Sequence, residues 1–134
     1  MNDSLGHADG EAVLYGMADR LAENVRRSDT VGRIGGEEFG VCMPSIDLNE
    51  ARAIAERLRR AVSAAPYETS SGPVTITVSI GVAAFTEGDN LMRLMERADL
   101  AMYAAKRGGR NRVTTEARDF VAGSHSLGQQ KASR

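Results

Sequence analysis

The sequence predicts an α+β fold in which helices pack on an antiparallel-rich sheet. Three segments carry apolar residues at helical spacing, and segments of alternating or short apolar character lie between them. Two of these strand-like segments are separated by a pair of glycines, which indicates a β-hairpin. Helices that alternate with an antiparallel hairpin are typical of an α+β sandwich, and 134 residues suit one domain with a single core.

The three predicted helices each have an apolar stripe. The first covers residues 10–25, and the second covers residues 48–64, where Asp47 and Glu50 form a capping-box pair at its start. The third covers residues 91–107, and Gly108 and the glycine after it end it. Each stripe is wide enough to bury one side of its helix against a sheet.

The predicted strands lie between these helices. Residues 74–84 alternate strictly between apolar and small or polar side chains, which is the period of a strand. Residues 30–34 and 38–43 form the two arms of the hairpin, and Gly35 and Gly36 form its tip, where positive φ favours glycine. After Val113 the pattern fades. We therefore expect one domain over residues 1–113 and a disordered tail over residues 114–134.

The bulk composition excludes several classes of protein. Hydrophobic residues make up 42% and charged residues 26%, and the net charge of −1 leaves no global basic field for nucleic acid or a membrane surface. A single cysteine, Cys42, excludes an intramolecular disulfide and cysteine-based zinc or iron–sulfur frameworks. No apolar run approaches the length of a membrane span, so we expect a cytoplasmic protein with no membrane contact by this segment.

The hairpin tip carries two adjacent acids that a turn does not need. Glu37 and Glu38 follow Gly35 and Gly36 directly. Carboxylate oxygens are hard ligands that hold Mg²⁺, and glycines leave room for a phosphate to approach the backbone. An ordinary hairpin explains the two glycines but not the two glutamates. A metal–nucleotide site explains both the glycine pair and the glutamate pair.

Four motifs in this order resemble those of the GGDEF family, the diguanylate cyclases, in its GGEEF form. "GGEEF" at 35–39 resembles the family signature, and "NDSLGHADGE" at 2–11 resembles its N-D-x-x-G-H-x-x-G-D. "SIGVAAF" at 79–85 and "ADLAMYAAKRGGRNRV" at 98–113 resemble its later strand and its ending. One such motif is weak, but four in register are specific.

The resemblance implies a palm-like fold similar to class III nucleotide cyclases, with a ferredoxin-like sandwich. It also implies that two GTP molecules are condensed into cyclic di-GMP with loss of two pyrophosphates, in a homodimer, with Mg²⁺ or Mn²⁺ as cofactor. Glu37 would be a metal ligand and the base for the 3′-hydroxyl, and Glu38 would assist with metal and substrate. Gly35 and Gly36 would let the backbone lie against the phosphates.

The resemblance also places substrate contacts elsewhere in the chain. Asn2 would bind guanine, His7 would lie along the substrate, and Glu11 stands where the family usually has Asp, as an acceptor for the guanine edge. Lys106 and Arg110 would hold the β- and γ-phosphates. Taken as isolated residues, His7 and Glu11 would also suit a surface pair, and the basic residues would suit a helix C-terminus.

A second site is implied by the spacing of an arginine and an aspartate ahead of the hairpin. Arg26 and Asp29 match the family's R-x-x-D inhibitory motif, which binds cyclic di-GMP and gives product inhibition, and Arg57 matches a secondary arginine of that site. The bland alternative is that these arginines complement the end of the preceding helix.

The family's domain starts with a helix and a strand ending in a metal-binding aspartate, upstream of anything that matches here. We therefore expect a domain that lacks its first strand and helix. Two functional classes remain open: a diguanylate cyclase, or a non-catalytic cyclic di-GMP-binding module or inactive truncated fragment.

Overall fold

The computed structural model describes residues 6–116 and 124–133. Over these residues the elements are α1 (His7–Glu23), β1 (Thr30–Gly35), β2 (Glu38–Pro44), α2 (Leu48–Ser63), β3 (Tyr67–Thr69), β4 (Gly72–Val74), β5 (Ser79–Thr86), α3 (Leu91–Arg107), β6 (Val113–Thr115) and β7 (Ser124–Ser133). No helix among them is long and apolar enough to cross a lipid bilayer. The mixture of helices and strands agrees with the predicted α+β class.

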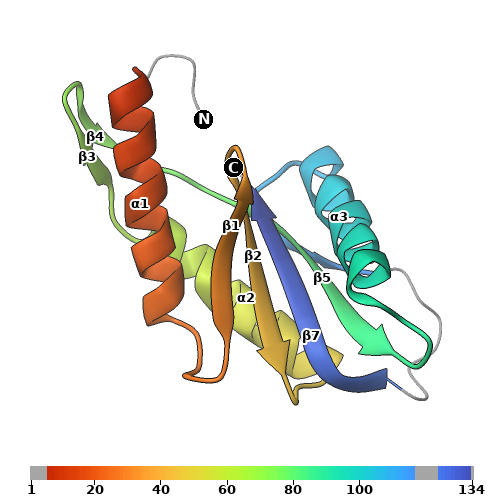
Figure 1. Ribbon diagram of the computed structural model, residues 1–134. Coiled ribbons are helices and arrows are strands. Elements are labelled where there is room, and N and C mark those ends of the chain that lie inside the picture. Colours follow the sequence, from red (N-terminus) through yellow and green to blue (C-terminus); the bar gives the residue numbers. More distant parts are fainter. Residues whose placement is uncertain (1–5, 117–123, 134) are drawn as a thin grey trace.

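The main sheet has five strands in the order β1-β2-β7-β5-β6, and β3 and β4 form a separate small hairpin (Figure 1). β7 is antiparallel to both β2 and β5, so β2 and β5 run in the same direction. β6 is parallel to β5. The first residues of β2, β5 and β6 therefore lie at one end of the sheet.

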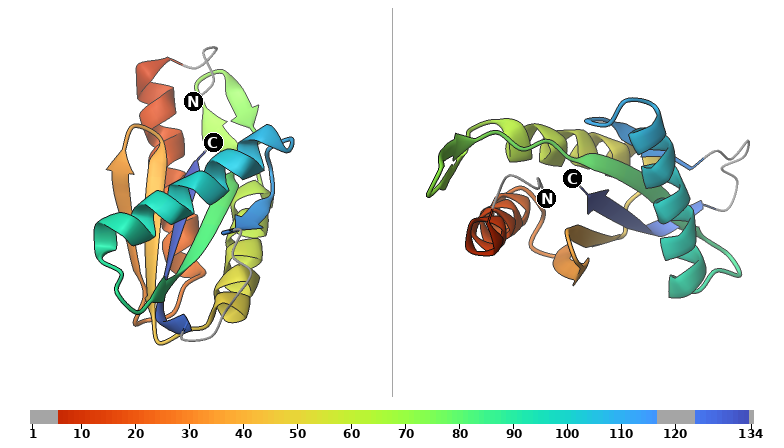
Figure 2. Two further views of the ribbon diagram at one scale, coloured as in Figure 1. Left: turned by 90° about the vertical axis from the view of Figure 1, so that its right-hand side faces the viewer. Right: turned by 90° about the horizontal axis from the view of Figure 1, so that it is seen from above.

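The helices cover both faces of this sheet. α1 and α2 share one core with Phe39, Val41 and Val82, whereas Ala83 faces the other way and packs against α3. This alternation follows from the period of two along a strand. In Figure 2, left, α3 crosses in front of the sheet while α1 and α2 lie behind it. The resulting three layers bury most of each predicted apolar stripe, although Leu91 at the start of α3 is 59% exposed.

Gly81 allows α3 to lie directly against β5. A Cβ atom built at Gly81 would lie 2.1 Å from the carbonyl oxygen of Ala98 and 2.2 Å from the amide nitrogen of Met102. Both of these atoms belong to the backbone of α3, so no side-chain rotation relieves the overlap. The glycine of "SIGVAAF" is therefore required by packing.

Side-chain caps determine where two helices begin. The Asp47 carboxylate accepts a hydrogen bond from the backbone N–H of Glu50 at 2.8 Å, which confirms the predicted start of α2. The Asn90 side chain caps α3 in the same way through the N–H of Arg93, at 2.9 Å. Gly108 is the C-cap of α3, so both predicted ends of this helix are confirmed.

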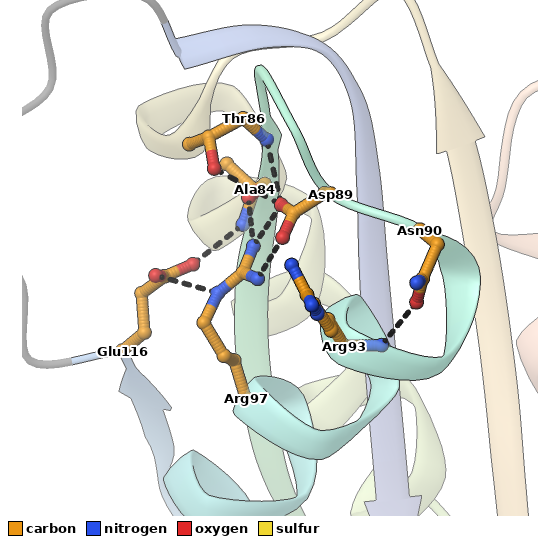
Figure 3. Close-up of polar contacts among 7 residues, drawn as sticks. All are labelled: Ala84, Thr86, Asp89, Asn90, Arg93, Arg97 and Glu116. Carbon is orange, nitrogen blue, oxygen red and sulfur yellow. Dashed lines mark hydrogen bonds and ion pairs between the residues drawn. The ribbon is translucent and has the colours of Figure 1, made fainter.

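A buried charge network joins the end of β5 to α3 and β6 (Figure 3). The Arg97 guanidinium donates to the carboxylates of Asp89 and Glu116 and to the carbonyl oxygen of Ala84. The side chains of Asp89 and Glu116 are 6% and 7% exposed. Hydrogen bonds from Arg97, followed by those from Thr86, outweigh burial and lower the pKa of Asp89 to about 2.

The structure differs from the expected tail at residues 124–133. These residues form β7, a central strand, although their sequence is polar. The physical reason is that backbone N–H and C=O groups pair with β2 and β5 whatever the side chains are, so a strand needs no apolar alternation when both of its edges are paired. Residues 113–115 likewise pair with β5 as β6.

One further expectation needs correction. The alternation over residues 74–84 predicts one strand, but β4 ends at Val74 and β5 begins at Ser79, with no strand between them. Tyr103 follows buried Met102 on α3 but is itself 59% exposed. Its ring lies on the outer side of α3, where the Arg107 guanidinium is 5.8 Å from the ring centroid.

Candidate functional site

Three segments that are distant in sequence meet at one end of the sheet. The β1–β2 hairpin tip precedes Glu38, the first residue of β2, and the loop after α3 precedes Val113, the first residue of β6. Because β2, β5 and β6 begin at the same end of the sheet, the tip and this loop lie at that end, although β1 and β6 are its opposite edge strands. α1 joins them there through a contact between Glu11 and Arg33. We call this end of the sheet the hairpin end.

The hairpin tip is a two-residue turn of Gly36 and Glu37, between paired Gly35 and Glu38. Gly36 takes a φ of +50°, as expected for a glycine at a turn, whereas Gly35 is the last residue of β1 and has no positive φ. A Cβ at either glycine would meet nothing within 4 Å, so the space beside them is open. Glu37 and Glu38 are half-buried.

Arg33 connects the tip to α1. Its Nη1 and Nη2 atoms lie 3.2 and 3.3 Å from the two carboxylate oxygens of Glu11, and its Nε donates to the carbonyl oxygen of Gly36 at 2.8 Å. Hydrogen bonding to Glu11 raises the pKa of the Arg33 guanidinium. Sequence reasoning assigned Arg33 no role, because Glu11 lies far from it in the chain.

The loop after α3 has a strained backbone. Gly109, Arg110 and Asn111 have φ values of +122°, +65° and +46°, a conformation that side chains other than glycine rarely adopt. The Arg110 N–H donates to the carbonyl oxygen of Ala105 at 3.0 Å, and the Asn111 side chain accepts from Arg59 of α2 at 2.9 Å. The loop is therefore held against both helices, with Arg110 exposed.

The structure places most of the predicted substrate contacts at the hairpin end. Glu11, Gly35, Gly36, Glu37 and Glu38 lie there together, and Lys106, in the last turn of α3, lies directly before the loop that carries Arg110. His7 is the first residue of α1. Asn2 lies outside the described residues. The roles of all these residues stay predictions.

The predicted inhibitory residues lie at the opposite end of β2. The Arg26 guanidinium pairs with the Asp29 carboxylate at 2.8 Å and donates to the carbonyl oxygen of Pro44, the last residue of β2, at 2.7 Å. The Asp29 side chain is fully buried. Arg57 donates to the carbonyl oxygen of Asn24, two residues before Arg26, at 2.6 Å.

These contacts separate two groups of predicted ligand residues. Glu38 and Pro44 lie at the two ends of β2, and six steps of roughly 3.3 Å place about 20 Å between them. Hydrogen bonding to Asp29 also raises the pKa of Arg26. The hairpin tip and the Arg26–Asp29 pair are therefore two separate places on the molecule.

The donor set at the hairpin end fits a hard divalent cation. Glu37 and Glu38 offer carboxylate oxygens, which Mg²⁺ and Mn²⁺ prefer to nitrogen or sulfur. Within residues 6–116 and 124–133, no three or more His, Cys, Asp or Glu side chains gather in a way that would hold a metal. The remaining ligands would come from phosphate oxygens and water, as is usual for Mg²⁺.

Comparison with known families assigns the fold. A model of the family "Diguanylate cyclase, GGDEF domain" matches residues 1–112, which is most of the chain. The chain belongs to the GGDEF domain family. The match spans the hairpin end and the Arg26–Asp29 pair alike, and it agrees with the resemblance inferred from the four motifs.

Curated relatives show the same domain within longer proteins. The diguanylate cyclase DgcP of Pseudomonas aeruginosa is 42% identical over 113 residues, covering 84% of this chain and 17% of its own length. The response regulator PleD of Caulobacter vibrioides is 47% identical over 120 residues, covering 87% and 26%. This chain therefore spans about a fifth of the length of these GGDEF proteins.

Solved GGDEF domains have the same arrangement. The GGDEF domain of DgcB from Caulobacter crescentus, in complex with c-di-GMP, matches with a TM-score of 0.79 and 37% identity over 85% of this chain and 68% of that chain. The active GGEEF domain of a diguanylate cyclase from Vibrio cholerae matches with a TM-score of 0.74 and 29% identity, over 88% and 75%. The palm-like α+β class is thereby confirmed.

Proposed function

We propose that residues 1–113 form the cyclase domain of a diguanylate cyclase, which condenses two GTP molecules into cyclic di-GMP and releases two pyrophosphates. The observation that carries this proposal is the hairpin end, where Glu37 and Glu38 lie beside open glycines at the same end of the sheet as the basic loop after α3. Family membership supports it. Because GTP is a cytoplasmic nucleotide, the proposed location is the cytoplasm.

The residues at the hairpin end divide the work by their chemistry. The Glu37 carboxylate accepts the proton of the attacking 3′-hydroxyl, while Glu38 assists in holding the metal and the substrate. Both carboxylates would hold Mg²⁺ or Mn²⁺, which would supply positive charge to neutralise the phosphates. Lys106 and Arg110 bind the outer phosphates, which leave as pyrophosphate.

Guanine recognition falls to α1 and the segment before it. The Glu11 carboxylate accepts hydrogen bonds from the guanine N1–H and 2-amino group, with Asn2 and His7 as further contacts. An adenine ring offers no donor at N1, so this acceptor favours GTP over ATP. The paired contact with Arg33 already holds this carboxylate at the hairpin end.

Turnover requires two domains face to face. Cyclic di-GMP is two-fold symmetric and each hairpin end holds one GTP, so the product forms between two copies in a homodimer. Product inhibition acts through a second ligand at Arg26, Asp29 and Arg57, at the far end of β2 from the hairpin tip. In that role, the Arg26–Asp29 pair opens or rotates to bind the inhibitor.

The substitution Glu37→Gln tests the catalytic role. An amide is a poor metal ligand and no base, so cyclic di-GMP formation from GTP should fall at least 100-fold at an unchanged melting temperature. Glu96→Gln, which changes an exposed carboxylate of α3, is the matched control and should keep its activity. Product is quantified by chromatography with GTP and, separately, ATP as substrate.

A binding module without catalysis is the second candidate, and the Arg26–Asp29–Arg57 cluster favours it because it is independent of the hairpin end. The same samples decide between the two by titration calorimetry with cyclic di-GMP. Product formation together with inhibition by added cyclic di-GMP supports the cyclase. Binding of cyclic di-GMP with no turnover by the unmodified chain supports the module instead.

A further inference from the structure

Arg33 contacts two parts of the hairpin end, the Glu11 carboxylate on α1 and the Gly36 carbonyl in the turn. Its side chain uses three nitrogen atoms: Nη1 and Nη2 toward the Glu11 carboxylate, and Nε toward the carbonyl oxygen of Gly36. A planar guanidinium has donors in fixed directions, so these contacts constrain each other. A lysine has one nitrogen and cannot reproduce this three-point arrangement.

The contact with Gly36 determines how one peptide group is oriented. The carbonyl of Gly36 and the N–H of Glu37 belong to the same planar, trans peptide unit and point in opposite directions. Because Nε holds the Gly36 oxygen at 2.8 Å, the Glu37 N–H is directed away from Arg33. The same plane limits φ of Glu37, and therefore the direction in which its carboxylate leaves the turn.

Gly36 makes this restraint necessary. A glycine at φ +50° in a turn has a wide choice of neighbouring conformations, and nothing lies within 4 Å of its Cβ position to limit them by packing. The neighbouring register between β1 and β2 is also irregular between Arg33 and Gly35. The hydrogen bond from Arg33, in the preceding strand, is a restraint that acts directly on the Gly36 carbonyl.

The ion pair between Arg33 and Glu11 contributes little to stability. The side chains of Arg33 and Glu11 are 39% and 34% exposed, and ion pairs at this exposure add little to stability because water screens them. This contact barely stabilises the fold, but it joins the Glu11 carboxylate to the Gly36–Glu37 turn. Its main effect is therefore on how these two groups are placed relative to each other.

We propose that Arg33 is a positioning residue of the nucleotide site, which holds the Gly36–Glu37 peptide and the Glu11 carboxylate at a set separation. This inference rests on the proposed function, because Glu11 is there the acceptor for guanine and the turn lies against the phosphates. One side chain thereby links recognition of the base to placement of the phosphates.

The test compares Arg33→Lys with the unmodified chain and with Arg52→Ala, which alters an exposed arginine of α2. The probes are GTP and ATP analogues with a methylene group between the α- and β-phosphorus atoms, measured by titration calorimetry with Mg²⁺. Misplacement of both contacts should weaken binding of the GTP analogue by about tenfold or more. The preference for the GTP analogue over the ATP analogue should fall in parallel, at an unchanged melting temperature.

Backbone amide spectra provide a readout that does not depend on the ligand. The amide resonances of Gly36 and Glu37 should shift or broaden in Arg33→Lys and stay in place in Arg52→Ala. If the unmodified chain binds neither analogue, the proposed function falls and this inference falls with it. If the unmodified chain prefers the GTP analogue and Arg33→Lys keeps the same affinity and preference, only the role of Arg33 is overturned.

Discussion

The glycine at the crossing of α3 over β5 and the glycines of the hairpin tip serve opposite needs. At Gly81 the backbone of α3 lies where a Cβ would be, while beside Gly35 and Gly36 a Cβ would meet nothing. One glycine is needed for close packing inside the molecule. The others leave space at an edge that a ligand can reach.

The charged groups of the two regions differ in the same way. Arg97 is enclosed with Asp89 and Glu116, whose side chains are less than a tenth exposed. Arg33 and Glu11 form a similar paired contact, but each keeps more than a third of its side chain in solvent. Buried pairs resist separation because an unpaired charge cannot be hydrated, whereas half-exposed pairs rearrange at low cost. The first arrangement holds the fold together, and the second leaves room for a ligand.

The largest expected effect is that of Gly81→Ala. The added methyl group would overlap backbone atoms of Ala98 and Met102, so α3 must move away from β5. We expect the free energy of unfolding to fall by about 3 kcal/mol or more, measured by urea denaturation. Gly32→Ala, in β1 with nothing within 4 Å, is the control and should change stability by less than about 0.5 kcal/mol. Equal effects in the two variants would show that the crossing adapts to a side chain.

Asp89→Asn should have the next largest effect, and one that depends on pH. The folded-state pKa of Asp89 is about 2, below its usual 3.8, so its ionised form stabilises the fold above about pH 4. This contribution, about 2 kcal/mol, disappears as the pH falls from about 4 to 2.

The variant should therefore be less stable than the unmodified chain at pH 7 and nearly as stable at pH 2. Unfolding midpoints in denaturant across this range measure the difference. Asp19→Asn, at an exposed position of α1, serves as the control. A stability loss in Asp89→Asn that stays constant with pH would contradict the assigned pKa.

The smallest expected effect on stability is the difference between alanine substitutions at the two glycines of the hairpin tip. Gly36→Ala should cost about 1 kcal/mol, because alanine at φ +50° is strained even though the space is open. Gly35→Ala lacks this strain and should leave stability nearly unchanged. Thermal melting of both variants provides the measurement. A cost at Gly35 equal to that at Gly36 would mean that lost space, and not φ, decides the residue there.

Local signals in the sequence were enough for the helices and the hairpin. Both ends of α3 follow from its apolar period and from Gly108, all within a few residues of the helix. The strand β7 could not be found this way, because its polar sequence shows no alternation and its stability depends on partners far away in the chain. The strands of the small β3–β4 hairpin are too short to show the two-residue period of a β-strand.

The residues of the candidate site also differ in whether a local signal in the sequence identifies them. Glu37 and Glu38 can be identified from the sequence because the unusual pattern, two acids directly after two glycines, is local. The Arg33–Glu11 contact joins α1 to β1 and depends on how those elements pack, so no spacing rule reveals it. Likewise, nothing in the sequence shows that Arg26 already has Asp29 and the Pro44 carbonyl as partners.

The central place of β7 has a consequence for the order of folding. α1, the β1–β2 hairpin and α2 are made of contacts between near neighbours in the chain, which form quickly, whereas β7 pairs with β2 across most of the sequence. Until residues 124–133 dock, the facing edges of β2 and β5 lack a partner strand and are open to pairing with another chain. This segment pairs slowly, so the two open strand edges persist for some time during folding. In that period the protein concentration, rather than the stability of the folded state, decides between the monomeric fold and aggregation.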